Sequence, residues 1–164
     1  MKAVLFLGRF QPFHNGHLKV LEELAEKYDK VVIAIGSRQH SRTKENPFSF
    51  EERRRVIEQI VKNRGIKNAE ITGIDDINRN EEYVAHVEKH ARFDAVATGN
   101  ELVKKLFREK GYRIIELPRY YELHAENLRK KVMEGNDFSE DVPEEVAEFL
   151  KEKGAEIIRR TNSG

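Results

Sequence analysis

Short apolar runs alternate with longer amphipathic segments through the first 118 residues of the chain. The runs have the length of buried strands and lie at 3–7, 31–35, 70–74, 94–97 and 113–117. Parallel strands need long crossover connections, usually helices. The alternation therefore predicts an α/β fold, in which five parallel strands form a Rossmann-like, doubly wound sheet.

Apolar residues at helical spacing fill the segments between and after these runs. Ser49 is followed three residues later by Glu52, a capping box that marks the start of a helix. The predicted helices are 16–27, 49–63, 81–91, 102–109, 125–134 and 143–153. We therefore expect one domain, residues 1–164, with a C-terminal helical part at about 119–160 and a loose polar tail at 161–164.

Composition narrows the classes of function. The 30 basic and 29 acidic residues give a net charge of +1, which argues against a protein that wraps a nucleic-acid backbone. The absence of cysteine excludes disulfides, thiolate metal sites and cysteine nucleophiles. No apolar run approaches the ~20 residues of a membrane span, and the N-terminus lacks the layout of a signal peptide. We expect a cytoplasmic protein with neither a nucleic-acid nor a membrane partner.

The segment Gly8-Arg9-Phe10-Gln11-Pro12-Phe13-His14-Asn15-Gly16-His17 joins the first predicted strand to the first predicted helix. A helix N-terminus offers unpaired N–H groups and partial positive charge, which favour phosphate. His14 and His17 add imidazole donors at that point, and Arg9 adds a guanidinium fork. Gly8 and Gly16 leave room for a ligand beside the backbone. Two surface histidines or a metal site are the alternatives, but two histidines without a third ligand favour phosphate.

This segment resembles the G-x-F-x-P-x-H-x-G-H signature of the HxGH nucleotidyltransferase superfamily, and Gly8, Phe10, Pro12, His14, Gly16 and His17 carry the match. Its full wording is similar to that of archaeal nicotinamide-nucleotide adenylyltransferases, as are 35–37, 46–48, 52–53, 98–100, 102–103 and 106–107. The resemblance covers most of the chain up to Val142. It implies the nucleotidyltransferase (HUP) type of doubly wound fold, and an enzyme that joins ATP to nicotinamide mononucleotide (NMN), giving NAD and pyrophosphate.

The resemblance also implies roles for individual residues. His14, His17 and Arg129 are expected to be catalytic, because they would contact the transferring and leaving phosphates. ATP is expected to bind at Gly8, Arg9, Phe10, Gln11, Gly16, Gly99, Asn100, His124 and Asn127, and NMN at Ser37, Arg42, Asp76, Ile77, Asn80 and Tyr83. Mg²⁺ is expected to bridge the ATP phosphates largely through water, so no side chain is assigned as a metal ligand. The implied assembly is a homo-oligomer, such as a hexamer.

Five of these positions have a structural alternative. Asn100 could simply cap the helix that follows it, and Arg129 could belong to a solvated helical face. Asp76 could cap the following helix, Tyr83 could belong to the core, and Arg42 could lie in a solvated basic loop. A ring at position 83 would stack on the nicotinamide ring, and the pyridinium charge would add cation–π attraction. The family more often has Trp at this position.

The chain departs from the family pattern at two further places. Glu45 lies near the position where the family often has an Arg that meets the acceptor phosphate. The family also has a Ser/Thr-rich turn before the basic residue matched by Arg129, whereas no Ser or Thr occurs here between Thr98 and Ser139. His124 and Asn127 would then replace the missing hydroxyl donors.

These departures leave three functions open. They are NAD synthesis, adenylyl or cytidylyl transfer to another phosphorylated acceptor, and nucleotide binding without turnover.

Overall fold

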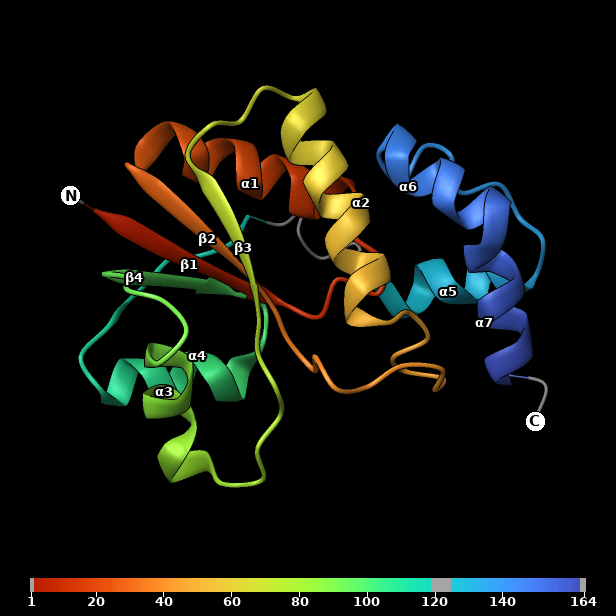
Figure 1. Ribbon diagram of the computed structural model, residues 1–164. Helices are drawn as coiled ribbons and strands as arrows, with labels where there is room; N and C mark the ends of the chain where they lie inside the picture. The colour runs from red at the N-terminus through yellow and green to blue at the C-terminus, as the bar shows by residue number, and fades with distance from the viewer. Residues whose placement is uncertain (1, 119–124, 163–164) are drawn as a thin grey trace.

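The computed structural model describes residues 2–118 and 125–162. One sheet of five parallel strands has the order β3-β2-β1-β4-β5 (Figure 1). The strands are β1 (Ala3–Gly8), β2 (Lys30–Ile35), β3 (Ala69–Gly73), β4 (Ala95–Thr98) and β5 (Arg113–Ile114). The prediction of a doubly wound α/β fold is confirmed. Because the strand order reverses between β1 and β4, a crevice is expected there at the carboxyl ends of the strands.

Both faces of the central strand β1 are buried, and Val4, Leu5 and Phe6 have no exposed surface. Val4 and Phe6 belong to one hydrophobic cluster, and Leu5 belongs to a second cluster on the other face. One face is covered by α1 (Asn15–Lys27) and α2 (Phe50–Asn63), the other by α3 (Asn80–Glu88) and α4 (Glu101–Glu109) (Figure 1). This double cover explains why the strands are apolar along nearly their whole length.

The C-terminal helices lie beyond the carboxyl ends of the strands (Figure 1). They are α5 (Ala125–Met133), α6 (Glu144–Phe149), the π-helical turn η2 (Leu150–Gly154) and α7 (Ala155–Asn162). Leu128, Val146 and Ile158 share the hydrophobic cluster of α1 and α2. The buried carboxylate of Glu145 also accepts hydrogen bonds from Asn63, at 2.9 Å, and from Arg64. The C-terminal helices therefore pack on the same core as the sheet.

Two predictions about the end of the chain were wrong. The helix predicted to stop at residue 153 continues through Gly154 into α7. Gly154 is buried, and it allows close packing rather than ending the helix, since a Cβ there would lie 2.9 Å from the Leu150 side chain. The tail predicted to be loose begins in α7, where the Thr161 and Asn162 side chains both donate to the Ile158 carbonyl. Strand β5 is also shorter than the predicted run, since its ladder with β4 pairs only Arg113 and Ile114.

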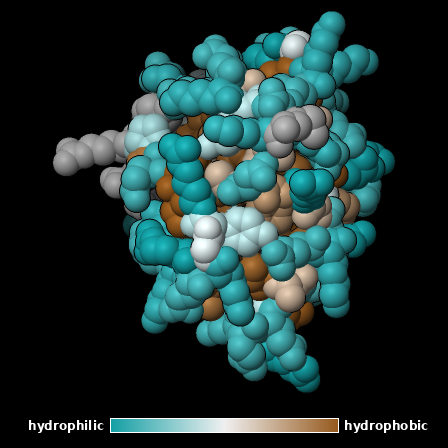
Figure 2. Space-filling view, turned by 90° about the vertical axis from the view of Figure 1, so that its left-hand side faces the viewer, coloured by the Kyte–Doolittle hydropathy of each residue, from teal (hydrophilic) through white to brown (hydrophobic). Residues whose placement is uncertain are grey.

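The opposite end of the sheet is closed by polar contacts. The Asp29 carboxylate accepts the backbone N–H of Lys2, and the Asp94 carboxylate accepts that of Ala3. Hydrophilic side chains cover most of this face (Figure 2). No helix among residues 2–118 and 125–162 combines the length and the apolar character that crossing a membrane requires.

Candidate active site

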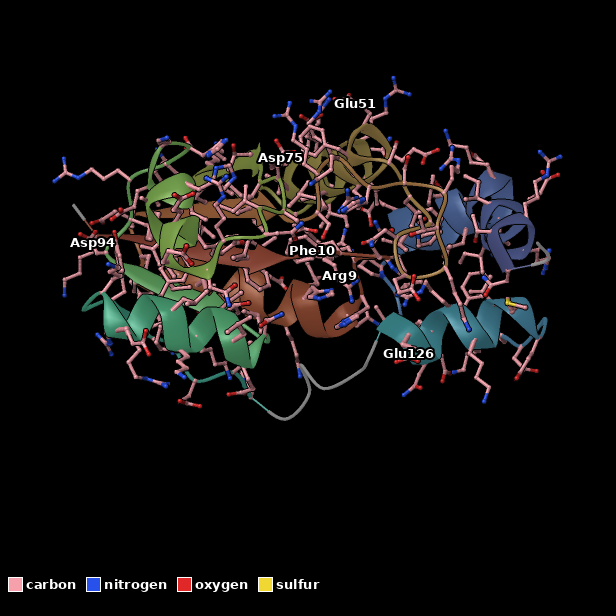
Figure 3. All side chains as sticks on the ribbon, turned by 90° about the horizontal axis from the view of Figure 1, so that it is seen from below. Arg9, Phe10, Glu51, Asp75, Asp94 and Glu126 are labelled. Carbon is pink, nitrogen blue, oxygen red and sulfur yellow. The ribbon has the colours of Figure 1, made fainter. Side chains whose placement is uncertain are left out.

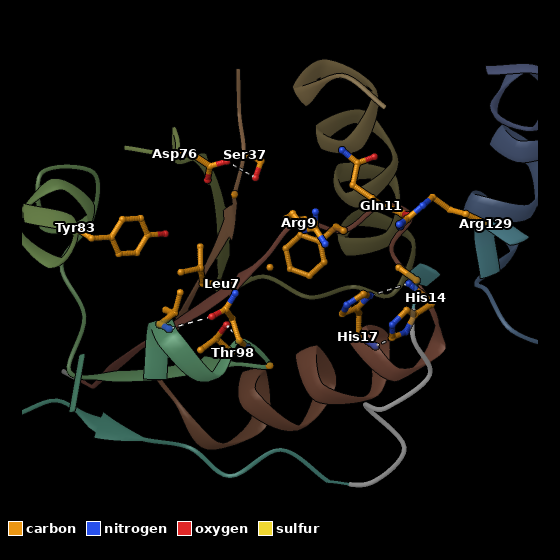
Figure 4. Close-up of a pocket in the computed structure, with 17 residues that line it drawn as sticks. Leu7, Arg9, Gln11, His14, His17, Ser37, Asp76, Tyr83, Thr98 and Arg129 are labelled. Carbon is orange, nitrogen blue, oxygen red and sulfur yellow. Dashed lines mark hydrogen bonds between the residues drawn. The ribbon is translucent and has the colours of Figure 1, made fainter. Parts of the chain in front are cut away.

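A pocket of about 350 Å³ opens at the carboxyl ends of β1 and β4, where the strand order places the crevice (Figure 4). It brings together these residues predicted from the sequence: Gly8, Arg9, Phe10, Gln11, His14, His17, Ser37, Asp76, Tyr83, Gly99, Asn100 and Arg129. The other lining residues were not predicted; they are Leu7, Gly36, Thr98, Val103 and Ala125. All five lie next to a predicted residue along the chain or at the start of a helix, so strand ends and helix starts are the signal for them.

The remaining predicted residues lie elsewhere. Gly16 is buried within α1, Asn80 and Asn127 are exposed near the starts of α3 and α5, and Ile77 lines a separate surface hollow. Both terminal nitrogens of Arg42 bind the carboxylate of Glu52, at 2.7 and 3.0 Å. His124 lies outside the described residues. The binding roles of these residues stay predictions.

The two histidines of the first loop cap α1 reciprocally. The His14 N–H donates to His17 Nδ1 at 3.0 Å, and the His17 N–H donates to His14 Nδ1 at 3.3 Å. The rings stack with their centroids 3.5 Å apart. Because each Nδ1 accepts a hydrogen bond, each neutral ring carries its proton on Nε2. The arrangement therefore fixes one tautomer for both rings and makes each Nε2–H a donor.

His17 is held in the neutral state. Its ring is packed against Phe10 and Phe13, with centroid distances of 4.8 and 5.2 Å. Burial, and then repulsion from His14, lower the pKa of His17 well below its usual value. The ring is thus an uncharged donor at neutral pH. Neither ring is the exposed surface histidine that the structural alternative describes, because His14 and His17 are both buried and both line the pocket.

The conformation of the first loop depends on Gly8 and Gln11. A Cβ at Gly8 would lie 3.1 Å from the ring of Phe10, whose φ of 54° folds that ring back over the strand end. The buried amide of Gln11 donates to the Phe48 carbonyl at 3.0 Å and accepts the Phe48 N–H at 2.9 Å. Both polar atoms of the Gln11 side chain therefore hold the first loop in place.

Two arginines give this end of the pocket its positive charge. Arg129 of α5 donates from Nη1 to the Gln11 carbonyl at 2.8 Å. Burial, and then the charge of Arg9, lower the pKa of Arg129. Arg9 is exposed, and in the view of Figure 3 it lies between α4 and α5. Together with the N-terminus of α1, these cations form a site suited to a polyphosphate.

The other end of the pocket carries a carboxylate and an aromatic ring. Asp76 accepts a hydrogen bond from Ser37 Oγ at 2.8 Å, and its backbone pairs with the side-chain amide of Gln39. Asp76 does not cap α3, because the N-cap residue of that helix is Arg79. Tyr83 points from α3 into the pocket, on the side opposite Arg129, and packs edge-on against Phe107 (Figure 4).

The tyrosine keeps its proton. Burial, and then the charge of Asp76, raise the pKa of Tyr83 to about 12. This end of the pocket therefore offers a flat ring, a neutral hydroxyl and one carboxylate, a combination suited to an aromatic base with a polar substituent.

Asn100 lines the pocket at the start of α4. Its Oδ1 accepts the Val103 N–H at 3.0 Å, which caps α4, and its own N–H donates to Thr98 Oγ1 at 3.3 Å. The helix cap and the pocket lining are thus formed by the same residue, as the sequence allowed.

Comparison with known proteins shows the family to which the chain belongs. The cytidylyltransferase-like family matches residues 5–142. The nicotinamide-nucleotide adenylyltransferase of Thermococcus onnurineus is 44% identical over 163 residues, covering 96% of this chain and 87% of that protein. The chain belongs to the nicotinamide-nucleotide adenylyltransferase family. The corresponding enzyme of Archaeoglobus fulgidus is 42% identical over 155 residues, covering 90% of this chain and 89% of the relative.

Two solved structures of nucleotide adenylyltransferases have a fold similar to that of this chain. A bifunctional NMN adenylyltransferase/ADP ribose pyrophosphatase from Francisella tularensis, complexed with AMP and an Mn ion, has a TM-score of 0.74 at 25% identity. The match covers 99% of this chain and 53% of that one, so this chain spans about half of the bifunctional protein. A putative nicotinate-nucleotide adenylyltransferase from Vibrio parahaemolyticus shares the fold, with a TM-score of 0.65 at 18% identity.

The charged residues of the pocket do not form a protein cage for a metal. Within residues 2–118 and 125–162, no group of three or more His, Cys, Asp or Glu side chains is arranged to hold a metal ion. Asp76 is the acidic residue among the described lining residues, so the pocket offers one carboxylate. This donor set fits a metal that arrives bound to phosphates better than a metal held by the protein.

Proposed function

We propose that this member of the nicotinamide-nucleotide adenylyltransferase family transfers the adenylyl group of ATP to NMN in the pocket between β1 and β4. The reciprocal cap of His14 and His17 is the observation that carries the proposal. It presents two Nε2–H donors at the N-terminus of a helix, next to Arg9 and Arg129. Such an array stabilises charge that develops on phosphate oxygens.

The reaction needs no general base. The 5′-phosphate of NMN is already an anion, and it attacks the α-phosphorus of ATP in line. A P–O bond forms between the two nucleotides, the bond between the α-phosphorus and the bridging oxygen breaks, and pyrophosphate leaves with both electrons of that bond. Positioning and charge stabilisation then supply the catalysis. His14 and His17 donate to the α-phosphate and the leaving oxygen, while Arg9 and Arg129 balance the charge of pyrophosphate.

The acceptor is assigned to the end of the pocket opposite the arginines. Tyr83 offers a ring face to the pyridinium of NMN, and Asp76 offers carboxylate oxygen to the amide N–H groups of the base. A carboxylate at this place would oppose the negative charge of nicotinate, so the amide form is the better fit.

Mg²⁺ is proposed as the metal cofactor, and it would supply positive charge to the triphosphate of ATP. No side chain of the pocket is assigned to it. The homo-oligomer, with a hexamer as its leading form, is also proposed, and light scattering of the purified chain tests it. The single-domain boundary at 1–164 and the cytoplasmic location stay predictions.

A pyrophosphate-release assay with a panel of acceptors tests the function. ATP with NMN is expected to release pyrophosphate and form NAD, detected by chromatography. Nicotinate mononucleotide, flavin mononucleotide, phosphopantetheine and glycerol phosphate complete the panel of acceptors, and CTP is tried in place of ATP as the donor. Turnover with another acceptor but not with NMN would overturn the assignment. Calorimetric binding of ATP without pyrophosphate release from any pair would indicate a binding module.

A further inference from the structure

Arg53 of α2 lies buried beneath the pocket, with 3% of its surface exposed. Its guanidinium donates to four backbone carbonyls. Nη1 bonds to Arg9 at 2.8 Å and to Gly36 at 2.7 Å, while Nη2 bonds to Ser37 at 3.1 Å and Nε bonds to Ser49 at 3.2 Å. No ion pair joins Arg53 to a carboxylate among the described residues. One side chain therefore links the loop after β1 to the loop after β2.

Burying a cation in this way is costly. A guanidinium loses its hydration on burial, and carbonyl dipoles replace it less well than a carboxylate would. Burial, and then the charge of Arg9, lower the pKa of Arg53 to about 10, so the group stays charged at neutral pH. An apolar side chain would avoid the cost of burying a charge, but it would leave the four carbonyls without a donor. The charge is therefore retained for the hydrogen bonds that it makes to the two loops.

The two loops that Arg53 joins contain backbone that needs an external anchor. Phe10 and Ser37 have φ values of 54° and 49°, in the left-handed region that non-glycine residues rarely adopt. Arg53 binds the carbonyl immediately before Phe10 and the carbonyl of Ser37 itself. The fork thus holds both unusual turns at once, where a single ammonium could not match the same directions.

Each of these turns carries a group assigned to one substrate. Arg9 extends from the first turn toward the phosphate end of the pocket, and Ser37 holds Asp76 at the acceptor end. We propose that Arg53 is a positioning residue for adenylyl transfer, whose guanidinium fixes the spacing between these two turns so that both substrates meet in line. This inference rests on the proposed function, and adds to it a residue that does not line the pocket.

The test compares Arg53→Lys with Arg55→Lys. Arg55 lies on the same helix but is exposed, which makes it a matched control. Misplacement by about 1 Å costs on the order of 10²-fold in rate, so Arg53→Lys is expected to lower kcat about 10²-fold. The KM for ATP should change by much less, and Arg55→Lys should stay within about twofold of the parent. A folded Arg53→Lys with the parent's kcat overturns the proposal, whereas a parent that forms no NAD overturns the function itself.

A double-mutant cycle with Arg9→Ala separates positioning from a general structural effect. If Arg53 acts through the placement of Arg9, the losses in kcat should be strongly non-additive, because the second change removes what the first has already disordered. Additive losses contradict the proposal.

A measurement on the unchanged chain decides the matter should Arg53→Lys fail to fold. The ¹⁵N resonances of the Arg53 guanidinium are expected to shift when ATP is added alone and when NMN is added alone, because the group touches both loops. Resonances that respond to neither substrate would overturn the proposal.

Discussion

The two ring nitrogens of His17 have separate tasks, and two substitutions can separate them. Nδ1 accepts the His14 N–H at 3.0 Å and so completes the cap of α1, whereas Nε2 is the donor assigned to phosphate. In His17→Asn the side-chain amide can occupy the place of Nδ1 but has nothing at the place of Nε2. In His17→Gln the amide reaches the place of Nε2 but leaves that of Nδ1 to a methylene group.

The structure gives different magnitudes for the two variants. Loss of one donor to a transferring phosphate costs on the order of 3 kcal/mol, so His17→Asn should lower kcat by ~10²-fold or more. It keeps the cap but loses the ring contacts with Phe10 and Phe13, worth about 1–2 kcal/mol of stability. His17→Gln loses about 1 kcal/mol more from the missing cap. It should nevertheless retain the larger share of the turnover.

The assay pairs pyrophosphate release under saturating ATP and NMN with urea unfolding of the same preparations. We expect the order of kcat to be parent, Gln, Asn, and the order of stability to be parent, Asn, Gln. If His17→Asn turns over as fast as the parent, the Nε2–H donor has no part in the reaction. That result would refute the assignment of His17 even if both variants were less stable than the parent.

Three further outcomes follow from other contacts. Tyr83→Ala removes the stacking ring, so the KM for NMN should rise at least about 10-fold while the KM for ATP changes little; equal effects on both would place the ring elsewhere. Burial alone would raise the pKa of Glu52, but hydrogen bonds from Arg42 and Ser49 outweigh it and lower the pKa from 4.5 to about 2. The stabilisation is therefore complete above pH 4.5 and disappears as the pH falls toward 2. Since Arg42 is half exposed, Glu52→Gln should cost about 2 kcal/mol at neutral pH in denaturant titrations, and a gap that persists at pH 2 would contradict this. Glu145→Ala strips the buried acceptor from Arg64 and should cost about 2 kcal/mol, measured by the same unfolding, with kcat unchanged.

The fold and the first loop were predictable because their signals are local. Alternation of apolar runs with amphipathic segments is fixed by strand and helix geometry, and it leads directly to a parallel sheet. Ser49 and Glu52 form the predicted capping box, with the Glu52 N–H donating to Ser49 Oγ at 3.2 Å. The spacing of His14 and His17 placed both rings at the start of a helix, as observed.

Contacts between distant segments could not be predicted in the same way. The amide pairing of Gln11 with Phe48 and the ion pair of Arg42 with Glu52 join loops whose approach depends on the whole fold. Gln11 and Arg42 were therefore assigned to substrates, although their side chains are engaged within the protein. Local sequence patterns did not indicate these internal contacts, since neither Gln11 nor Arg42 interrupts a periodic pattern.

Arg53 did leave a signal in the sequence. It lies three, four and seven residues before Val56, Ile57 and Ile60, which form the buried stripe of α2. A charged residue on the apolar stripe of a helix is a conflict between local pattern and burial, and such conflicts concentrate at functional sites. The signal was missed because Arg53 is followed by Arg54 and Arg55, and a run of arginines is typical of a solvated helix face.

A crystal structure of the chain with ATP or a non-hydrolysable analogue tests the central claim most directly. The account predicts phosphate oxygens within hydrogen-bonding distance, about 2.7–3.2 Å, of Nε2 of both His14 and His17, with Arg129 on the terminal phosphates. A nucleotide whose phosphates lie against other residues, with both imidazoles out of contact, would contradict it.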